Sequence, residues 1–210
     1  MRFPLGVVDV VYAQLPVEER ARAAAADGFE HIDVMADVDP GALALPVGCP
    51  TSYPKPRPGW CATPAPRDGP DVWERTVELF RGAPGALLEP WAGAVVNSAE
   101  RCRAIMAAVP GLRLLVDTGH VADWGGDPLE LLPCADHVQL RQGRPGSTQV
   151  HAADPTGVID FAAVVGRLDE LDYPGALSVE YFDLPQEGWG LDDPRAWAVD
   201  LAEVVRPLLG

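Results

Sequence analysis

The sequence has few of the residues from which sulfur-rich or nitrogen-rich metal centres are built. Its 210 residues include four cysteines and four histidines, and the cysteines lie far apart with no CxxC pair. This spacing favours free thiols in a reducing compartment over a disulfide framework or a structural zinc site. Any metal centre in this chain is therefore expected to use mainly oxygen ligands.

Long apolar runs are also absent. No uninterrupted stretch reaches the roughly 18 residues that a membrane-spanning helix needs. The N-terminal MRFPLGVVDVVYAQ has neither a long apolar core nor a small-residue cleavage site, so no signal peptide is expected. We expect a cytoplasmic protein that does not bind membranes.

Positive charge is scarce. The chain has 31 acidic and 16 basic residues, a formal net charge of −15 and 48% hydrophobic residues. Such a chain gains little from releasing counterions of a phosphate backbone, which argues against nucleic acid as a partner. The composition is that of a globular protein, and the length predicts a single domain over residues 1–210.

Short apolar runs alternate with helix-like segments, which is the pattern of an α/β fold with a parallel sheet and helical crossovers. Strands are expected at 4–11, 29–35, 86–91, 112–117, 136–141 and 176–181, with a weaker candidate at 42–50. Helices are expected at 17–28, 98–109, 158–171 and 192–209.

Residues 50–70 carry seven of the 22 prolines. Proline removes a backbone donor, so this segment is incompatible with a regular helix or a central strand. We expect a proline-rich surface loop. A lid over an active site, bearing Tyr53, Lys55, Arg57 and Trp60, is the alternative, because long loops in compact domains are often functional.

Polar side chains recur where the expected strands end. Glu89, Asp117, Gln139 and Glu180 each lie at or near the C-terminal end of a different strand. In a parallel sheet or barrel these ends meet at one face, where active sites are built. Three carboxylates converging there would repel one another without a cation, and oxygen ligands suit Mg²⁺ or Mn²⁺.

The ordered stretches LLEPW, VDTGH, HVQLRQGRPG and GVIDFAAVVGRLDELDYPGALSVEY resemble the xylose isomerase-like TIM-barrel superfamily of sugar isomerases, epimerases and AP endonucleases. The resemblance covers residues 86–182 well and the N-terminal part loosely, through GFEHIDV. It implies a TIM-type (β/α) barrel and a divalent metal, Mn²⁺ or Mg²⁺ first, with Zn²⁺ or Co²⁺ left open. It also implies a small-molecule substrate such as a sugar, sugar phosphate or hydroxy acid.

Carried over by this resemblance, the metal ligands are Glu89, Asp117, Gln139 and Glu180. Most relatives have histidine at the position of Gln139, whereas the hydroxypyruvate isomerase branch has glutamine followed by a turn similar to GRPG (143–146). The resemblance makes Glu89 and Glu180 the catalytic acid–base pair, working through a cis-enediolate. For substrate binding it points to three residues: His120, Arg144 and His151. His31 and His137 lie in expected strands and are interpreted as packed or hydrogen-bonded residues.

The match fails around strands three and four. A complete barrel of this type has about 250 residues and eight strands, whereas this chain has 210 residues and about seven expected strands. We therefore expect a shortened or incomplete barrel. Its four histidines and its acidic charge count against a DNA repair endonuclease. Three functions remain open: a metal-dependent isomerase or epimerase, a metal-dependent lyase, dehydratase or cyclase, and a non-catalytic barrel that binds a ligand or partner. A homo-oligomer is compatible with each, because a missing unit exposes sheet edges.

Overall fold

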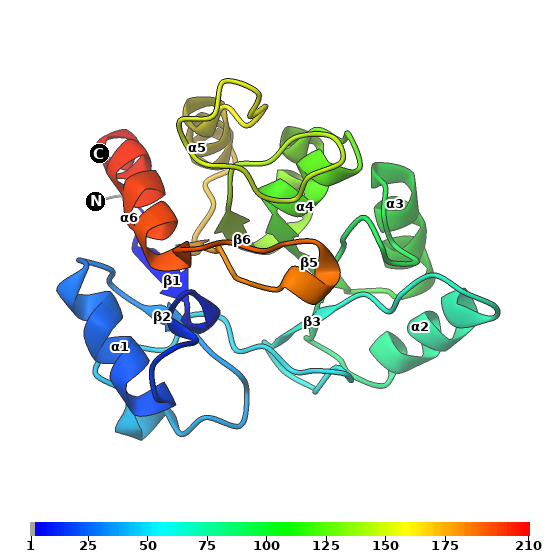
Figure 1. Ribbon diagram of the computed structural model, residues 1–210. Coiled ribbons are helices and arrows are strands. Elements are labelled where there is room, and N and C mark those ends of the chain that lie inside the picture. Colours follow the sequence, from blue (N-terminus) through cyan, green and yellow to red (C-terminus); the bar gives the residue numbers. More distant parts are fainter. Residues whose placement is uncertain (1–2) are drawn as a thin grey trace.

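The computed structural model describes residues 3–210, and these form a curled parallel sheet with helices on its outer side (Figure 1). Its seven strands follow the order β2-β1-β7-β6-β5-β4-β3. The strands are β1 (Leu5–Val8), β2 (Ile32–Asp33), β3 (Ala62–Pro64), β4 (Leu87–Glu89), β5 (Arg113–Asp117), β6 (Ala135–Leu140) and β7 (Leu177–Val179). The predicted TIM-type barrel in shortened form is therefore confirmed.

Six α-helices are present in residues 3–210: α1 (Val17–Ala26), α2 (Val72–Arg81), α3 (Ala99–Ala108), α4 (Thr118–Asp123), α5 (Phe161–Glu170) and α6 (Pro194–Val205). Four of them match the predicted helices, whereas α2 and α4 were not predicted. Side-chain oxygens cap four of the N-termini, those of Ser98, Asp117, Asp160 and Asp193. These caps satisfy backbone N–H groups that the first helical turn leaves unpaired. None of the helices in this part of the chain combines the length and the apolar character needed to cross a bilayer.

The two edge strands of the sheet, β2 and β3, are joined by residues 46–52. On one side Ile32 N–H donates to the Pro46 carbonyl at 3.0 Å and Thr51 N–H donates to the Val34 carbonyl at 2.8 Å. On the other side Ser52 N–H donates to the Ala62 carbonyl at 2.8 Å. In place of the weak strand candidate at 42–50, the structure has a hydrogen-bonded but irregular segment. Figure 1 shows helices around the strands except between α1 and α2.

Part of the proline-rich stretch is a strand. The expected surface loop is wrong for Ala62–Pro64, which forms β3 and pairs in parallel with β4, Pro64 lying opposite Glu89. Pro64 is tolerated because it is the last residue of an edge strand, where a missing donor costs little. The cis peptide bond Tyr53–Pro54 and the exposed Tyr53 lie in the loop that precedes it.

Side chains alternate between the two faces of the strands and so define the barrel interior. Leu114, Val116, Val138 and Leu140 belong to the main apolar core between sheet and helices. The residues next to these in each strand face the barrel interior, where Cys49, Ala62, Leu87 and Leu115 form a separate small cluster. Because side chains alternate along a strand, the residues two positions after Leu87 and Leu115 also face inward, and these are polar. Those are the positions at which the sequence predicted a site.

Candidate active site

The four predicted strand-end residues lie at one end of the barrel. Glu89 ends β4, Asp117 ends β5, Gln139 is the penultimate residue of β6, and Glu180 follows β7 directly. A cavity of about 610 Å³ opens there, and Glu89, Gln139 and Glu180 line it together with His120. Asp117 is fully buried behind this wall.

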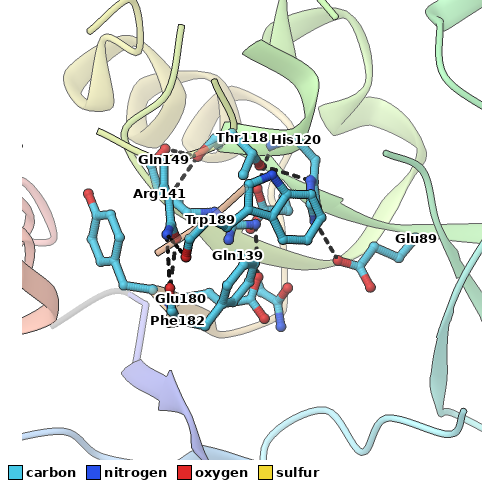
Figure 2. Close-up of polar contacts among 12 residues, drawn as sticks. Glu89, Thr118, His120, Gln139, Arg141, Gln149, Glu180, Phe182 and Trp189 are labelled. Atoms are coloured by element: carbon cyan, nitrogen blue, oxygen red, sulfur yellow. Dashed lines mark hydrogen bonds and ion pairs between the residues drawn. The ribbon is translucent and has the colours of Figure 1, made fainter. Parts of the chain in front are cut away.

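Glu89, His120 and Glu180 form the most compact group of potential ligands in residues 3–210. Each offers one ligand atom, and these atoms lie within 4.8 Å of one another. His120 comes from α4, which begins directly after β5, and its Nε2 is 3.6 Å from Glu89 Oε1. Its other ring nitrogen, Nδ1, is 2.9 Å from the Thr148 hydroxyl. Figure 2 shows the contact between His120 and Glu89 as a dashed line.

Burial controls the protonation of this group. It raises the pKa of Glu89 to about 8, with the negative charge of Asp117 adding to the effect. It also raises the pKa of Glu180 well above its usual value, although the Arg141 charge opposes the rise. Burial and the neighbouring Arg141 lower the pKa of His120 to about 3. The imidazole is therefore neutral and has a lone pair with which it can bind a metal ion.

Arg141 is the main site residue that the sequence analysis missed. Its side chain is completely buried, and its Nη2 lies 2.9 Å from Asp117 Oδ2 and 3.0 Å from Glu180 Oε2. Burial disfavours its charge, but Asp117 and Glu180 raise its pKa above the usual value and keep it protonated. The sequence did contain an indication of this position. In HVQLR (137–141) every second residue is polar, and residues two apart in a strand lie on the same face. Figure 2 shows Arg141 directly beside Glu180.

A second polar network, also missed in part, lies deeper in the barrel. Asp33 at the end of β2 accepts a hydrogen bond from Cys49 N–H at 2.7 Å and lies 2.7 Å from His137 Nε2. His31 Nε2 is 2.9 Å from the Ser178 hydroxyl. Burial alone would raise the pKa of Asp33, but His137 and its hydrogen bonds lower it below the usual value. His31 and His137 are buried and hydrogen-bonded, as predicted, and Asp33 was not singled out.

Aromatic side chains cover the cavity. The loop after β7 passes across the strand ends in Figure 1 and carries Trp189, whose ring centroid is 5.6 Å from that of His120 and 6.1 Å from that of Trp91. Phe182 and Trp189 are in contact at 5.3 Å. Of the four residues proposed for a lid, only Tyr53 lines the cavity. The aromatic cover therefore comes mainly from the other side of the barrel.

Two predicted substrate-binding residues are not brought to the cavity. Arg144 is exposed and donates to the Thr156 hydroxyl at 2.5 Å. His151 Nε2 lies 3.0 Å from Asp200 Oδ2, and its ring packs edge-on against Trp197 of α6. Both residues belong to the loop between β6 and α5, of which Thr148, and not Arg144 or His151, contacts His120. His120 is the one member of the predicted substrate set that lines the cavity.

The donors at the cavity fit a divalent ion. Two carboxylates and a neutral imidazole form a mixed oxygen and nitrogen set, which suits Mn²⁺, Zn²⁺ or Co²⁺ and also accepts Mg²⁺. Gln139 Oε1 is buried without a hydrogen-bond partner among the described residues, and Gln139 lines the same cavity. An orphaned amide oxygen of this kind needs a partner, and a bound ion or its water would supply one.

Comparison with solved structures found several with a similar fold. A structure of L-ribulose 3-epimerase has 17% identity and a TM-score of 0.71, covering 100% of this chain and 95% of the other. D-psicose 3-epimerase with D-tagatose, from Clostridium cellulolyticum H10, has 13% identity and a TM-score of 0.72, with 98% and 99% covered. AsbF from Bacillus anthracis, a probable 3-DHS dehydratase involved in petrobactin synthesis, has 13% identity and a TM-score of 0.69, with 95% and 98% covered.

These identities are too low to establish more than the fold. The search of curated proteins found no sequence match. The resemblance of residues 137–146 to the hydroxypyruvate isomerase branch stays a prediction. The family model for the xylose isomerase-like TIM barrel, in contrast, matches residues 15–208, almost the whole chain. The protein belongs to the xylose isomerase-like TIM barrel family.

Proposed function

We propose that this protein is a divalent-metal-dependent isomerase or epimerase of a small sugar or related hydroxy-carbonyl compound. The observation that carries the proposal is the meeting of two buried carboxylates, Glu89 and Glu180, with the neutral His120 at one cavity. Proton transfer next to a carbonyl requires acid–base groups whose pKa lies near the working pH. Burial has moved the pKa values of Glu89 and Glu180 upward, in that direction.

Glu89 and Glu180 would carry the proton. One carboxylate takes the proton from the carbon next to the carbonyl, the C–H electron pair forms a carbon–carbon double bond, and the carbonyl π pair moves onto its oxygen, which gives a cis-enediolate. When the other carboxylate returns a proton to the same carbon, the original carbonyl re-forms and an epimer results. When the proton goes to the neighbouring carbon and the hydroxyl proton moves to the former carbonyl oxygen, an isomer results. A divalent ion at Glu89, His120 and Glu180, with Asp117 and Gln139 predicted as further ligands, would supply a Lewis acid for the developing oxyanion.

The cavity fits a sugar-sized substrate. Its walls combine the aromatic faces of Trp91, Phe182 and Trp189 with the polar groups of the site. A sugar has the matching character, because its C–H face packs on aromatic rings while its hydroxyl groups bond to polar side chains. The apolar rings also limit the water that reaches the carboxylates.

Deuterium exchange tests the proposal. The purified protein, loaded with Mn²⁺, is incubated in D₂O with a panel of ketopentoses and ketohexoses, and the products are followed by NMR. We expect deuterium at the carbon next to the carbonyl, together with the epimer or aldose. Glu89→Gln and Glu180→Gln should each lower the rate by at least about a hundredfold, whereas Glu203→Gln, on the exposed side of α6, should not change it. A panel that exchanges no deuterium above the protein-free rate would contradict the proposal.

A dehydratase is the second candidate, because AsbF is among the similar structures. A dehydratase would also remove a proton next to a carbonyl, but the electron pair would expel a hydroxyl group from the adjacent carbon, and this group would take a proton from the second carboxyl and leave as water. The same NMR samples separate the two reactions. A new carbon–carbon double bond conjugated with the carbonyl, with its ultraviolet absorption, favours the dehydratase, and an epimer with unchanged mass apart from deuterium favours the epimerase.

A further inference from the structure

Both carboxylate oxygens of Asp117 already have partners. Its Oδ1 accepts the backbone N–H of His120 at 2.7 Å and so caps α4, while its Oδ2 receives the Arg141 guanidinium at 2.9 Å. The carboxylate is fully buried, and it is not among the three residues whose ligand atoms come together. Its two oxygens thus already have the partners that burial of a charge requires.

The residues that follow Asp117 hold Arg141 in place. The Thr118 hydroxyl donates to the Arg141 carbonyl at 2.8 Å and accepts the Arg141 N–H at 2.9 Å. A Cβ at Gly119 would lie 2.9 Å from Arg141 Nε and 2.2 Å from the Thr148 carbonyl oxygen. Gly119 therefore provides the space through which the arginine side chain passes. The DTG stretch at 117–119 is shaped around Arg141 at three successive positions.

The far side of the guanidinium is also fixed. Arg141 Cζ lies 4.4 Å from the centre of the Phe182 ring, and its Nη2 reaches Glu180 at 3.0 Å. A guanidinium stacked on an aromatic face and paired with two carboxylates has little freedom to leave. Arg141 does not line the cavity, so it acts on the site through the two carboxylates and not by touching the substrate.

We propose that Arg141 is a resident cation that withdraws Asp117 from metal coordination, so that a divalent ion is held by Glu89, His120 and Glu180 while Asp117 positions Arg141 and α4. The inference rests on the metal site of the proposed function. It changes the ligand set predicted from the sequence, in which Asp117 was a direct ligand. The charges agree with it for the ion-bound state: with Glu89, Asp117 and Glu180 all deprotonated, three negative charges face the one positive charge of Arg141, which leaves two for a divalent ion.

Metal affinity tests the role of Asp117. Mn²⁺ binding is measured by isothermal titration calorimetry on the full-length protein after EDTA treatment. Asp117→Asn keeps an oxygen for the N-cap of α4 but removes the negative charge. We expect its Mn²⁺ dissociation constant to stay within about threefold of the wild type, whereas Glu180→Gln raises it at least about tenfold. Asp117→Asn should instead lower the melting temperature of the metal-free protein, because Arg141 loses a partner. A loss of Mn²⁺ affinity as large as that of Glu180→Gln overturns the inference.

The complementary variant is Arg141→Met, which keeps an extended side chain against Phe182 without the charge. It frees Asp117 and removes a positive charge beside the ion, so Mn²⁺ should bind at least about tenfold more tightly than to the wild type. Arg141→Lys keeps the charge and should bind Mn²⁺ with an affinity near that of the wild type. An Arg141→Met protein that binds Mn²⁺ no more tightly than the wild type contradicts the inference. If Arg141→Met does not fold, the Asp117→Asn comparison decides.

Failure of the proposed function gives a different pattern. If the wild type binds no Mn²⁺ and converts no sugar, the metal-dependent isomerase is excluded for this chain. In that case Mn²⁺ titration of Arg141→Met alone tests the role of Arg141. The inference then requires that this variant binds Mn²⁺ through the freed Asp117. A wild type that binds Mn²⁺ but converts no sugar leaves the Arg141 inference standing and removes only the reaction.

Discussion

At the scale of single residues, Asp33 shows how a charge is kept inside the barrel. It is completely buried, and its charge is compensated by two partners, the Cys49 N–H and the His137 ring, both at 2.7 Å. Gly48 is part of the same arrangement, because a Cβ there would lie 2.2 Å from Asp33 Oδ1. The network links β2, β6 and the joining segment 46–52, so it stabilises the barrel at the place where regular strands are missing.

Removing this carboxylate should be costly. We expect Asp33→Ala to lower the free energy of unfolding by about 3 kcal/mol, because it leaves the Cys49 N–H and the His137 ring buried without their partner. The measurement is urea unfolding, where the midpoint should fall with an unchanged slope. Asp37→Ala, at an exposed position four residues later, is the control and should change stability by less than about 0.5 kcal/mol. Equal midpoints for the two variants would show that the network contributes nothing.

Single residues also mark how far the sequence predicts the site. Glu89, Asp117, Gln139 and Glu180 could be found because each ends an apolar run, and the parallel topology brings strand ends together. Arg141 was not found, since a charged residue at the end of a strand usually faces water. Its burial depends on the carboxylates of two other strands, and such pairing is a property of the folded barrel and not of the local sequence.

At the scale of elements, the start of α6 is tied to the end of α1. Arg195 donates two hydrogen bonds to Asp27, both at 2.7 Å, and the Tyr12 hydroxyl donates a third at 2.8 Å. The Arg195 hydrogen bond is the main cause that lowers the pKa of Asp27 below its usual value of 3.8. These contacts join the first and last α-helices, which follow the paired strands β1 and β7.

This contact predicts a pH dependence. Because the pKa of Asp27 is lower in the folded state than in the unfolded chain, its stabilising effect is complete above pH 3.8 and is lost as the pH falls through the folded-state value. We expect Asp27→Asn to lower the free energy of unfolding by about 1–2 kcal/mol at pH 7, a value reduced by the partial exposure of Arg195. Urea unfolding should show this difference shrinking below pH 3.8. The exposed Asp192→Asn is the control, and a difference that stays constant down to pH 2 would contradict the explanation.

Most elements were predicted from their local pattern, whereas α2 was missed although Val72, Thr76, Val77 and Phe80 are buried at helical spacing. Helices α1, α3, α5 and α6 have clear caps or repeated apolar positions, and they were found. Helix α2 follows the N-cap residue Asp71, whose φ of 53° is unusual for a non-glycine residue and whose side chain makes no cap hydrogen bond. Strand β3 lies among prolines and is three residues long. Its pairing with β4, and not its composition, makes it a strand.

At the scale of the whole molecule, charge is the property that the sequence establishes most directly. The net charge of −15 means that folding brings many negative charges closer together. Salt screens such repulsion over the Debye length. With EDTA present, we expect NaCl to raise the melting temperature by a few degrees between about 20 and 500 mM. Choline chloride should act equally, because screening depends on ionic strength and not on the cation. A melting temperature that falls in both salts would contradict this prediction.

The joining segment 46–52 makes one side of the barrel a single layer of chain, without an α-helix outside it (Figure 1). The consequence is a gradient in local opening. Amide protons of Gly48, Thr51 and Ser52, which bond across this side, should exchange with deuterium through small openings, whereas those of β5 and β6 should exchange only when the whole domain unfolds. Hydrogen-exchange mass spectrometry would resolve the two classes. A barrel can thus omit helices and keep its ring of hydrogen bonds, but the uncovered part becomes the place where unfolding begins.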